Sequence, residues 1–98
     1  MDSYLEQNSQ LKNNKIMKLI IYKFKDNFNK FVKKETLFDD IPTLGIAFTC
    51  IDNWCHDNNR IIENFSYINK EMDKISVKTK RTEIAEDDFD IIFDILEK

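Results

Sequence analysis

The stretch "PTLGIAFTCIDNWC", Pro42–Cys55, is the most apolar part of the chain and decides the fold that we expect. Its apolar side chains would point in nearly every direction around a helix axis, and a helix that is apolar all round is a buried one. Pro42 suits the first turn of such a helix, where an N–H group would have no partner. We therefore expect a central buried helix. Its apolar positions are Leu44, Ile46, Ala47, Phe48, Cys50, Ile51, Trp54 and Cys55.

Gly45 and Trp54 stand out within this expected helix. A glycine inside a helix costs about 1 kcal/mol relative to alanine, so we expect Gly45 to permit the close approach of a neighbouring helix. Trp54 would be a large anchor at the far end. Core packing is the favoured interpretation of both residues, and lining of a partner pocket is the alternative. The residues that we expect in the structural core are Gly45, Phe48, Ile51, Trp54, Phe65 and Phe89.

Three other stretches, residues 15–32, 61–77 and 83–97, repeat apolar side chains at spacings of three and four. This is the period of an amphipathic helix. The chain therefore predicts a single all-α domain over residues 15–98, a compact helical bundle around the central buried helix, after a polar lead-in at residues 1–14. The alternative is strands at Leu19–Phe24 and Ser76–Thr79, because "LIIYKF" also fits an edge strand.

The composition narrows the class of protein. The chain has 98 residues, of which 42% are hydrophobic and 12% aromatic, which suits one small folded domain. A single glycine cannot build a glycine-rich phosphate loop, and one glycine with one proline offers few turns for an all-β sandwich. No apolar run approaches 18 residues and no signal-peptide profile is present, so we expect a cytoplasmic protein without a membrane span.

The charges are unevenly distributed along a chain of net charge −3. Residues 12–34 hold eight lysines and one acid, whereas residues 83–98 hold seven acids and one lysine. The simplest interpretation is that the two stretches neutralise each other or form solvated faces. The basic stretch has no arginine for bidentate contacts, and an acidic chain repels polyanions, which argues against a nucleic-acid partner.

No group of residues predicts catalysis or metal binding. His56 is the only histidine, and adjacent helical residues point about 100° apart, so it forms no dyad with Cys55. Zinc needs three or four closely placed Cys or His ligands. The acids Asp87, Asp88, Asp90 and Asp94 lack the glycine and spacing of a calcium loop, and we expect a solvated helix face there. We predict no enzyme, no cofactor, no metal and no small-molecule substrate.

The stretch "DNFNKFVKKETLFDDIPTLGIAFTCIDNWCHDNN", residues 26–59, resembles the central region of poxvirus Bcl-like proteins. The shared features are an Asn-Phe-x-Lys lead, the Leu37–Phe38 pair, and Leu44–Ile46 opening an apolar helix that ends in Trp54. The closing "EDDFDIIFDILEK", residues 86–98, is similar to the final helix of that family. The resemblance covers about residues 26–98. The chain is shorter than family members usually are, so the first one or two helices would be missing or compressed.

The resemblance implies a non-enzymatic viral protein that binds a host protein in the host cytoplasm. Such proteins modulate innate immune signalling, through NF-κB or interferon induction, or apoptosis. Some bind an amphipathic partner helix in a hydrophobic groove and others dimerise, so a homodimer is compatible with the family.

The alternative function, from another class, is that of a small acidic inhibitor or immunity protein that neutralises a basic toxin or nuclease. That alternative predicts that the acids of residues 83–97 form one exposed, contiguous patch. Binding through such a patch would weaken steeply with salt.

Overall fold

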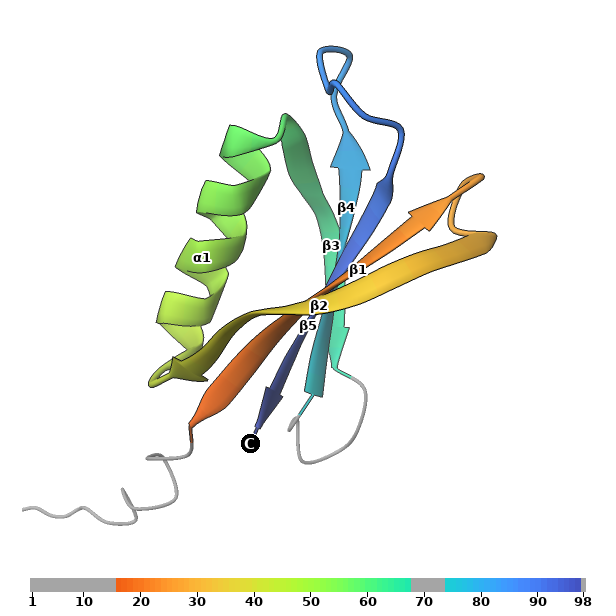
Figure 1. Cartoon of the computed structure of the whole chain (residues 1–98). Coiled ribbons are helices and arrows are strands. Elements are labelled where there is room, and N and C mark those ends of the chain that lie inside the picture. The colour runs from red at the N-terminus through yellow and green to blue at the C-terminus, as the bar shows by residue number, and fades with distance from the viewer. Residues whose placement is uncertain (1–15, 68–73, 98) are drawn as a thin grey trace, which may run out of the picture.

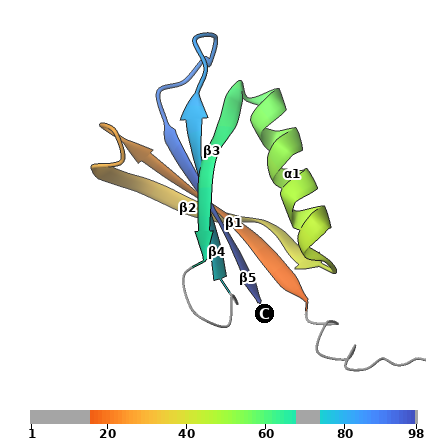
Figure 2. The same ribbon diagram turned by 180° about the vertical axis from the view of Figure 1, so that it is seen from behind.

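The computed structural model describes residues 16–67 and 74–97, and shows a five-stranded antiparallel sheet with one helix on one face (Figures 1 and 2). The sheet order is β2-β1-β5-β4-β3. The polar lead-in expected at residues 1–14 lies outside the described residues. The elements are β1 (Met17–Lys25), β2 (Lys30–Ile41), α1 (Leu44–Asp57), β3 (Arg60–Tyr67), β4 (Lys74–Arg81) and β5 (Asp90–Glu97).

The expected all-α bundle is wrong, because three of its four helices are strands. In the described parts of these stretches, residues 16–32 include β1 and the start of β2, residues 61–67 belong to β3, residues 74–77 belong to β4, and residues 83–97 form a loop and β5. The strand alternative is correct at both of its positions, since Leu19–Phe24 lies in β1 and Ser76–Thr79 in β4. However, β1 is not an edge strand, because it pairs with β2 on one side and β5 on the other.

The scarcity of glycine did not prevent a sheet, because other residues adopt the left-handed backbone conformation at its turns. Asp26, Asn27 and Phe28 have φ values of 57°, 56° and 69° in the turn between β1 and β2, and Asn59 has 58° before β3. Asparagine and aspartate tolerate this region better than other non-glycine residues, whereas phenylalanine does not. A low glycine count therefore does not exclude a sheet when Asn and Asp stand at its turns.

A helix does form in the central apolar stretch, but no other helix of the described residues encloses it. Thr43 caps α1 by accepting a hydrogen bond from the Ile46 N–H on its side-chain oxygen, at 3.2 Å. The buried residues of α1 are Ala47, Ile51 and Cys55, which repeat every fourth position and form one stripe. Ile46, on another side of the helix, is 45% exposed. The helix therefore lies on the sheet with one face buried.

The core lies between α1 and the sheet. Side chains alternate between the two faces of a strand, so every second residue of the inner strands points toward α1. Trp54 of α1 packs edge-on against the buried Phe93 of β5, with ring centroids 5.3 Å apart. The buried strand residues of this core include Leu19, Ile21, Ile75, Val77, Ile91, Phe93 and Ile95.

Candidate functional site: an acidic loop held by a buried arginine

The residues expected in the core lie at different depths. Ile51 is fully buried, and Phe48, Trp54 and Phe89 are partly buried against the core. Phe65, on the edge strand β3, is 50% exposed and contacts Phe48 edge-on at 5.6 Å. These five residues therefore range from the centre of the core to the surface.

Gly45 lies on the exposed surface of α1 and is not a core residue. A methyl group added there would come no closer than 4.0 Å to Thr43 Oγ1, and within the described residues no backbone of another element approaches it. The expected close approach of another helix at Gly45 is therefore wrong.

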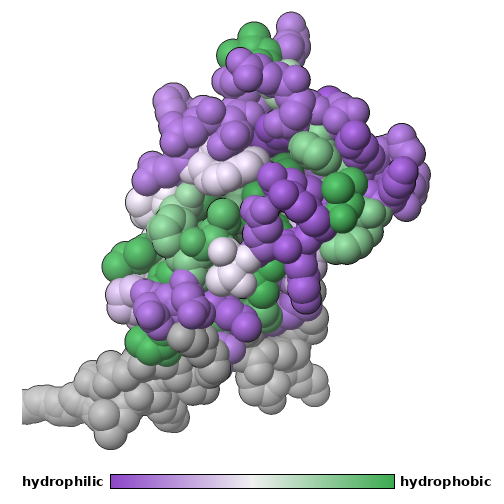
Figure 3. Space-filling view, viewed as in Figure 1, coloured by the Kyte–Doolittle hydropathy of each residue, from purple (hydrophilic) through white to green (hydrophobic). Residues whose placement is uncertain are grey.

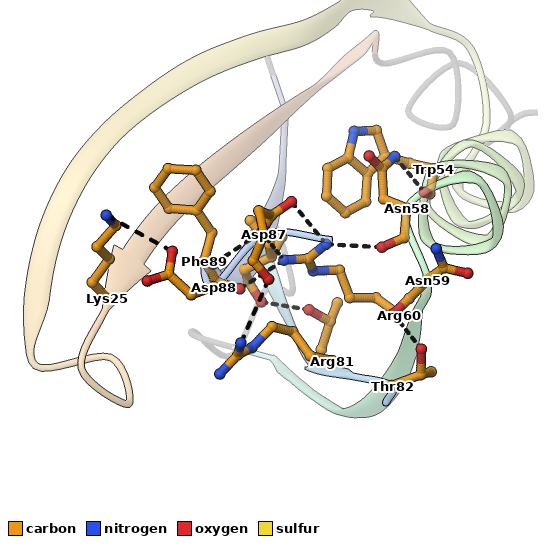
Figure 4. Close-up of polar contacts among 12 residues, drawn as sticks. Lys25, Trp54, Asn58, Asn59, Arg60, Arg81, Thr82, Asp87, Asp88 and Phe89 are labelled. Carbon is orange, nitrogen blue, oxygen red and sulfur yellow. Dashed lines mark hydrogen bonds and ion pairs between the residues drawn. The ribbon is translucent and has the colours of Figure 1, made fainter. Parts of the chain in front are cut away.

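The most organised polar site in the described residues surrounds Arg60, at the start of β3 (Figure 4). The Arg60 side chain is only 1% exposed, and its guanidinium lies over the Trp54 ring, 5.6 Å from the centroid. It donates hydrogen bonds to the Asn58 carbonyl and the Phe89 carbonyl, both at 2.8 Å. Arg60 therefore joins the end of α1 to the beginning of β5.

Asp87, in the loop between β4 and β5, is the charged partner of Arg60. Both carboxylate oxygens accept from the guanidinium, and Oδ1 also accepts from the Phe89 N–H at 2.9 Å. Burial alone would raise the pKa of Asp87, but the hydrogen bonds from Arg60 and Phe89 and the charge on Arg60 outweigh it. The pKa of Asp87 is therefore held below its usual range.

A second set of contacts holds the same loop from its other end. Thr82 donates both its backbone N–H and its hydroxyl to the Asn59 carbonyl, at 3.0 and 2.9 Å. The Arg81 guanidinium lies 3.5 Å from the Asp87 carbonyl. The loop is thus fixed at Thr82, Asp87 and Phe89 rather than only at the ends of its strands.

The acids of this loop and the end of α1 lie together at one end of the molecule, which Figure 3 shows as mostly hydrophilic with a hydrophobic group at its tip. We call the group Asp57, Glu83, Glu86, Asp87 and Asp88 the acidic end; all five are exposed. A shallow hollow of about 110 Å³ between α1 and the loop is lined by Asp57, Asn58, Asn59, Glu86 and Asp87.

The helix itself adds negative potential at the acidic end. The last carbonyls of a helix carry a partial negative charge equivalent to about half an electron. Asn58 caps α1 at this hollow, beside Asp57. Arg60 offsets Asp87, and Lys25 lies 3.8 Å from Asp88, which leaves Asp57, Glu83 and Glu86 as the least compensated acids. The site therefore favours a cation.

The thiol of Cys55, beside the site, is not activated as a nucleophile. Burial and the charge on Asp52 raise the pKa of the Cys55 thiol to about 11, although Arg60 opposes this. A thiol that stays protonated is a poor nucleophile. Over the described ranges 16–67 and 74–97, no three His, Cys, Asp or Glu residues lie where they could hold a metal ion. No helix in those ranges is long and apolar enough to cross a membrane.

The charge pattern predicted part of this site. Of the four acids expected on a solvated helix face, Asp87 and Asp88 are exposed but lie on a loop, whereas Asp90 is half-buried and Asp94 is buried in the sheet at 4% exposure. The acids of residues 83–97 therefore do not form one exposed, contiguous patch. Arg60 was missed. The available signal was that Arg60 and Arg81 are the only two arginines of a lysine-rich chain, and both bind the loop at Asp87.

Comparisons with known proteins identify no relative. No family model matches the chain, and neither the curated proteins nor the solved structures contain a significant match. The fold and the site therefore rest on the contacts described above.

Proposed function

We propose that this chain is a non-enzymatic protein-binding module and that a cationic protein docks on its acidic end. The observation that carries the proposal is the fixed loop: Arg60, itself buried, holds Asp87 inward while Glu83 and Glu86 stay exposed. A surface that is already ordered loses less conformational entropy when a partner binds. The function belongs to the class of small acidic inhibitor or immunity proteins, which neutralise a basic toxin or nuclease.

The hollow beside α1 supplies the specific contact. A lysine or arginine side chain of the partner would meet the Asp57 and Glu86 carboxylates and the carbonyl end of the helix in one place. Complementary charges of this kind raise the association rate and make it sensitive to salt.

The narrower function implied by the family resemblance, modulation of host immune signalling or apoptosis, is left as a prediction. That function was inferred for a helical bundle, and the five-stranded sheet presents other surfaces to a partner than a helical bundle does. A protein partner is common to both functions, and the acidic end is the surface on which we place it.

The test is affinity capture from the source-cell lysate with the wild-type chain and the double variant Glu83→Lys/Glu86→Lys. We expect the wild type to retain a basic protein at 50 mM salt and to release it at 300 mM salt. The double variant should not retain this protein at either salt concentration. If that partner is a nuclease, an equimolar amount of the wild-type chain should inhibit its activity.

The matched control is Glu35→Lys/Glu63→Lys, which makes the same change in net charge at exposed positions on β2 and β3. The control should retain the partner as the wild type does. Equal capture by the Glu83→Lys/Glu86→Lys variant would exclude the acidic end as the docking surface.

A further inference from the structure

The face of the sheet opposite α1, which we call the open face, carries a continuous row of side chains across all five strands. The residues of this row are successive Cα partners: Tyr22 pairs with Lys34 and with Ile92, Lys78 pairs with Ile92, and Asn64 pairs with Lys78. Their sequence neighbours Ile21 and Val77 point into the core, so this row points away from α1. In Figures 1 and 2, α1 lies on the other side of the sheet.

The open face concentrates lysines, although the whole chain is acidic. The alternation of β1, β2 and β4 places Lys18, Lys34, Lys74, Lys78 and Lys80 on it. Within the described residues, Lys34 and Lys80 form no ion pair. The charge of this face is therefore positive, while many of the acids lie at the acidic end.

The acids on the open face are engaged by neighbouring groups. Asp94 is 4% exposed, accepts from the Ser76 hydroxyl at 2.7 Å and lies 3.5 Å from the Lys74 ammonium. The Asp90 carboxylate accepts the Phe28 backbone N–H at 3.1 Å. At the β3 edge, Glu63 lies 3.9 Å from Lys78, a half-exposed pair of the kind that contributes little.

Aromatic rings lie among these lysines. Phe24 packs against Phe28 and Phe31 with centroid distances of 5.7 Å in both pairs, and Phe31 is 55% exposed. The Lys78 ammonium lies 4.9 Å from the centre of the Phe28 ring. Beside them, a hollow of about 230 Å³ is lined by Tyr22, Phe24, Lys74, Ser76, Ile92 and Asp94.

The backbone of Phe28 is strained in a way that places its ring on this face. Its φ of 69° is costly for a residue with a bulky side chain, and the hydrogen bond to Asp90 holds it there. Strain of this kind is concentrated at functional sites. The turn therefore contributes a ring to the open face at a cost in conformational energy.

We propose that the open face binds single-stranded nucleic acid, with the lysines on the phosphates and the exposed ring of Phe31 and the half-buried ring of Tyr22 stacking on bases. Lysine and aromatic side chains together match a strand that alternates phosphates with unpaired bases. A duplex would keep its bases stacked internally, and an acidic peptide would leave the rings without partners. Because phosphates are common to all nucleotides and every base offers a face for stacking, binding is largely independent of sequence.

The sequence argued against a nucleic-acid partner, because a chain of net charge −3 repels polyanions. That argument does not apply to the open face, because its own charge is positive. The open face adjoins the acidic end, because Glu83 lines the same hollow as Phe28, Lys78 and Lys80. The variants that test the two surfaces nevertheless change different residues. The two proposals therefore have independent tests.

The test titrates the full chain into fluorescently labelled 12-nucleotide oligo-dT or oligo-U and measures the fluorescence anisotropy at 50 and 200 mM salt. We expect saturable binding to both strands that weakens with salt, since each phosphate contact releases counterions. Tighter binding to a duplex of the same length would overturn the proposal. Equal competition by polyphosphate or by poly-glutamate would also overturn it, because neither offers bases to the rings.

Two neighbouring lysines provide the sharpest control. Lys34 pairs with Tyr22 on the open face, whereas Lys33 pairs with Lys23 and lies 2.9 Å from Glu35 on the other side of the strand. We expect Lys34→Glu to weaken binding roughly fivefold or more and to lower the salt slope by about one. We expect Lys33→Glu to change affinity less than about twofold; equal losses would exclude the open face.

The aromatic contribution has its own variant. Phe31→Ala should weaken binding to both strands roughly tenfold, as expected for the loss of one stacked base. Val32→Ala, which alters the next exposed apolar side chain, should leave affinity unchanged. Circular dichroism of each variant checks that the sheet is retained. Unchanged binding by a folded Phe31→Ala variant would exclude stacking at this ring.

Discussion

Arg60 and Asp87, 27 residues apart in the chain, form a two-point ion pair that fixes the loop between β4 and β5 to the end of α1. The arginine is almost completely buried, whereas the aspartate is 43% exposed. The pair therefore joins the interior of the protein to the surface that we assign to binding. The guanidinium of Arg60 also lies over the Trp54 ring, so the Arg60 side chain covers one edge of the core.

Removing the arginine should destabilise the whole domain. In Arg60→Ala, Asp87 loses its partner and the carbonyls of Asn58 and Phe89 lose a donor. We expect the free energy of unfolding in urea, followed by the fluorescence of the single tryptophan, to fall by about 2–4 kcal/mol. Arg81→Ala, an exposed control that also removes an arginine from Asp87, should cost less than about 1 kcal/mol. Equal effects of the two variants would contradict the role of Arg60.

Acid should weaken the same ion pair. Because the pKa of Asp87 in the folded state lies below its usual value of 3.8, the unfolded chain takes up the proton first as pH falls. The stabilisation is present above that usual value and is lost as pH falls through the folded pKa. Urea titrations between pH 7 and pH 2.5 should therefore show the difference between wild type and Asp87→Asn shrinking below about pH 4. A difference that stays constant over this range would exclude Asp87 as the titrating group.

The strands were predicted as helices because the centre of this sheet is apolar on both faces. In β1, Leu19 and Ile21 face the core, while Ile20 between them is only 7% exposed on the open face. A run of this kind fits the helical and the strand period equally well. The central helix was located correctly because its apolar run is long, although Pro42, expected in its first turn, lies before the capping residue Thr43. Which side of the helix would be buried depended on the sheet, which the pattern did not reveal.

The candidate site could be predicted only in part, for a physical reason. Charge clustering is visible along the chain, and it indicated the acids of residues 83–97, of which those up to residue 88 belong to the site. The pairing of Arg60 with Asp87 depends on β3 and β5 lying on either side of β4, which no local spacing encodes. Of the five lysines on the open face, only Lys18 and Lys34 belong to the basic stretch of residues 12–34. Within that stretch, the strand period separates Lys33 from Lys34 and places them on opposite faces.

Two isoleucines of α1 test whether the helix lies on a sheet or within a bundle. Ile51 is fully buried and Ile46 is 45% exposed. We expect Ile51→Ala to lower the free energy of unfolding by about 2–5 kcal/mol, because it leaves a cavity against the sheet. Ile46→Ala should change it by less than about 1 kcal/mol, since alanine's higher helix propensity partly offsets the lost contacts. Comparable losses at both positions would indicate that α1 is enclosed on all sides.

Gly45→Ala should stabilise the protein, which is the opposite of what a close helix contact would give. Gly45 does not have a positive φ, and a methyl group there would meet only Thr43 Oγ1 at 4.0 Å. Alanine restricts the unfolded chain and favours the helix, so we expect a gain of roughly 0.5–1 kcal/mol in the free energy of unfolding. Thermal and urea unfolding of the variant measure it, with Thr49→Ala, another exposed position of α1, as a control for general helix propensity. A loss of stability in Gly45→Ala would mean that a backbone or partner packs closely against this side of α1, because no other contact in the described fold opposes the added methyl group.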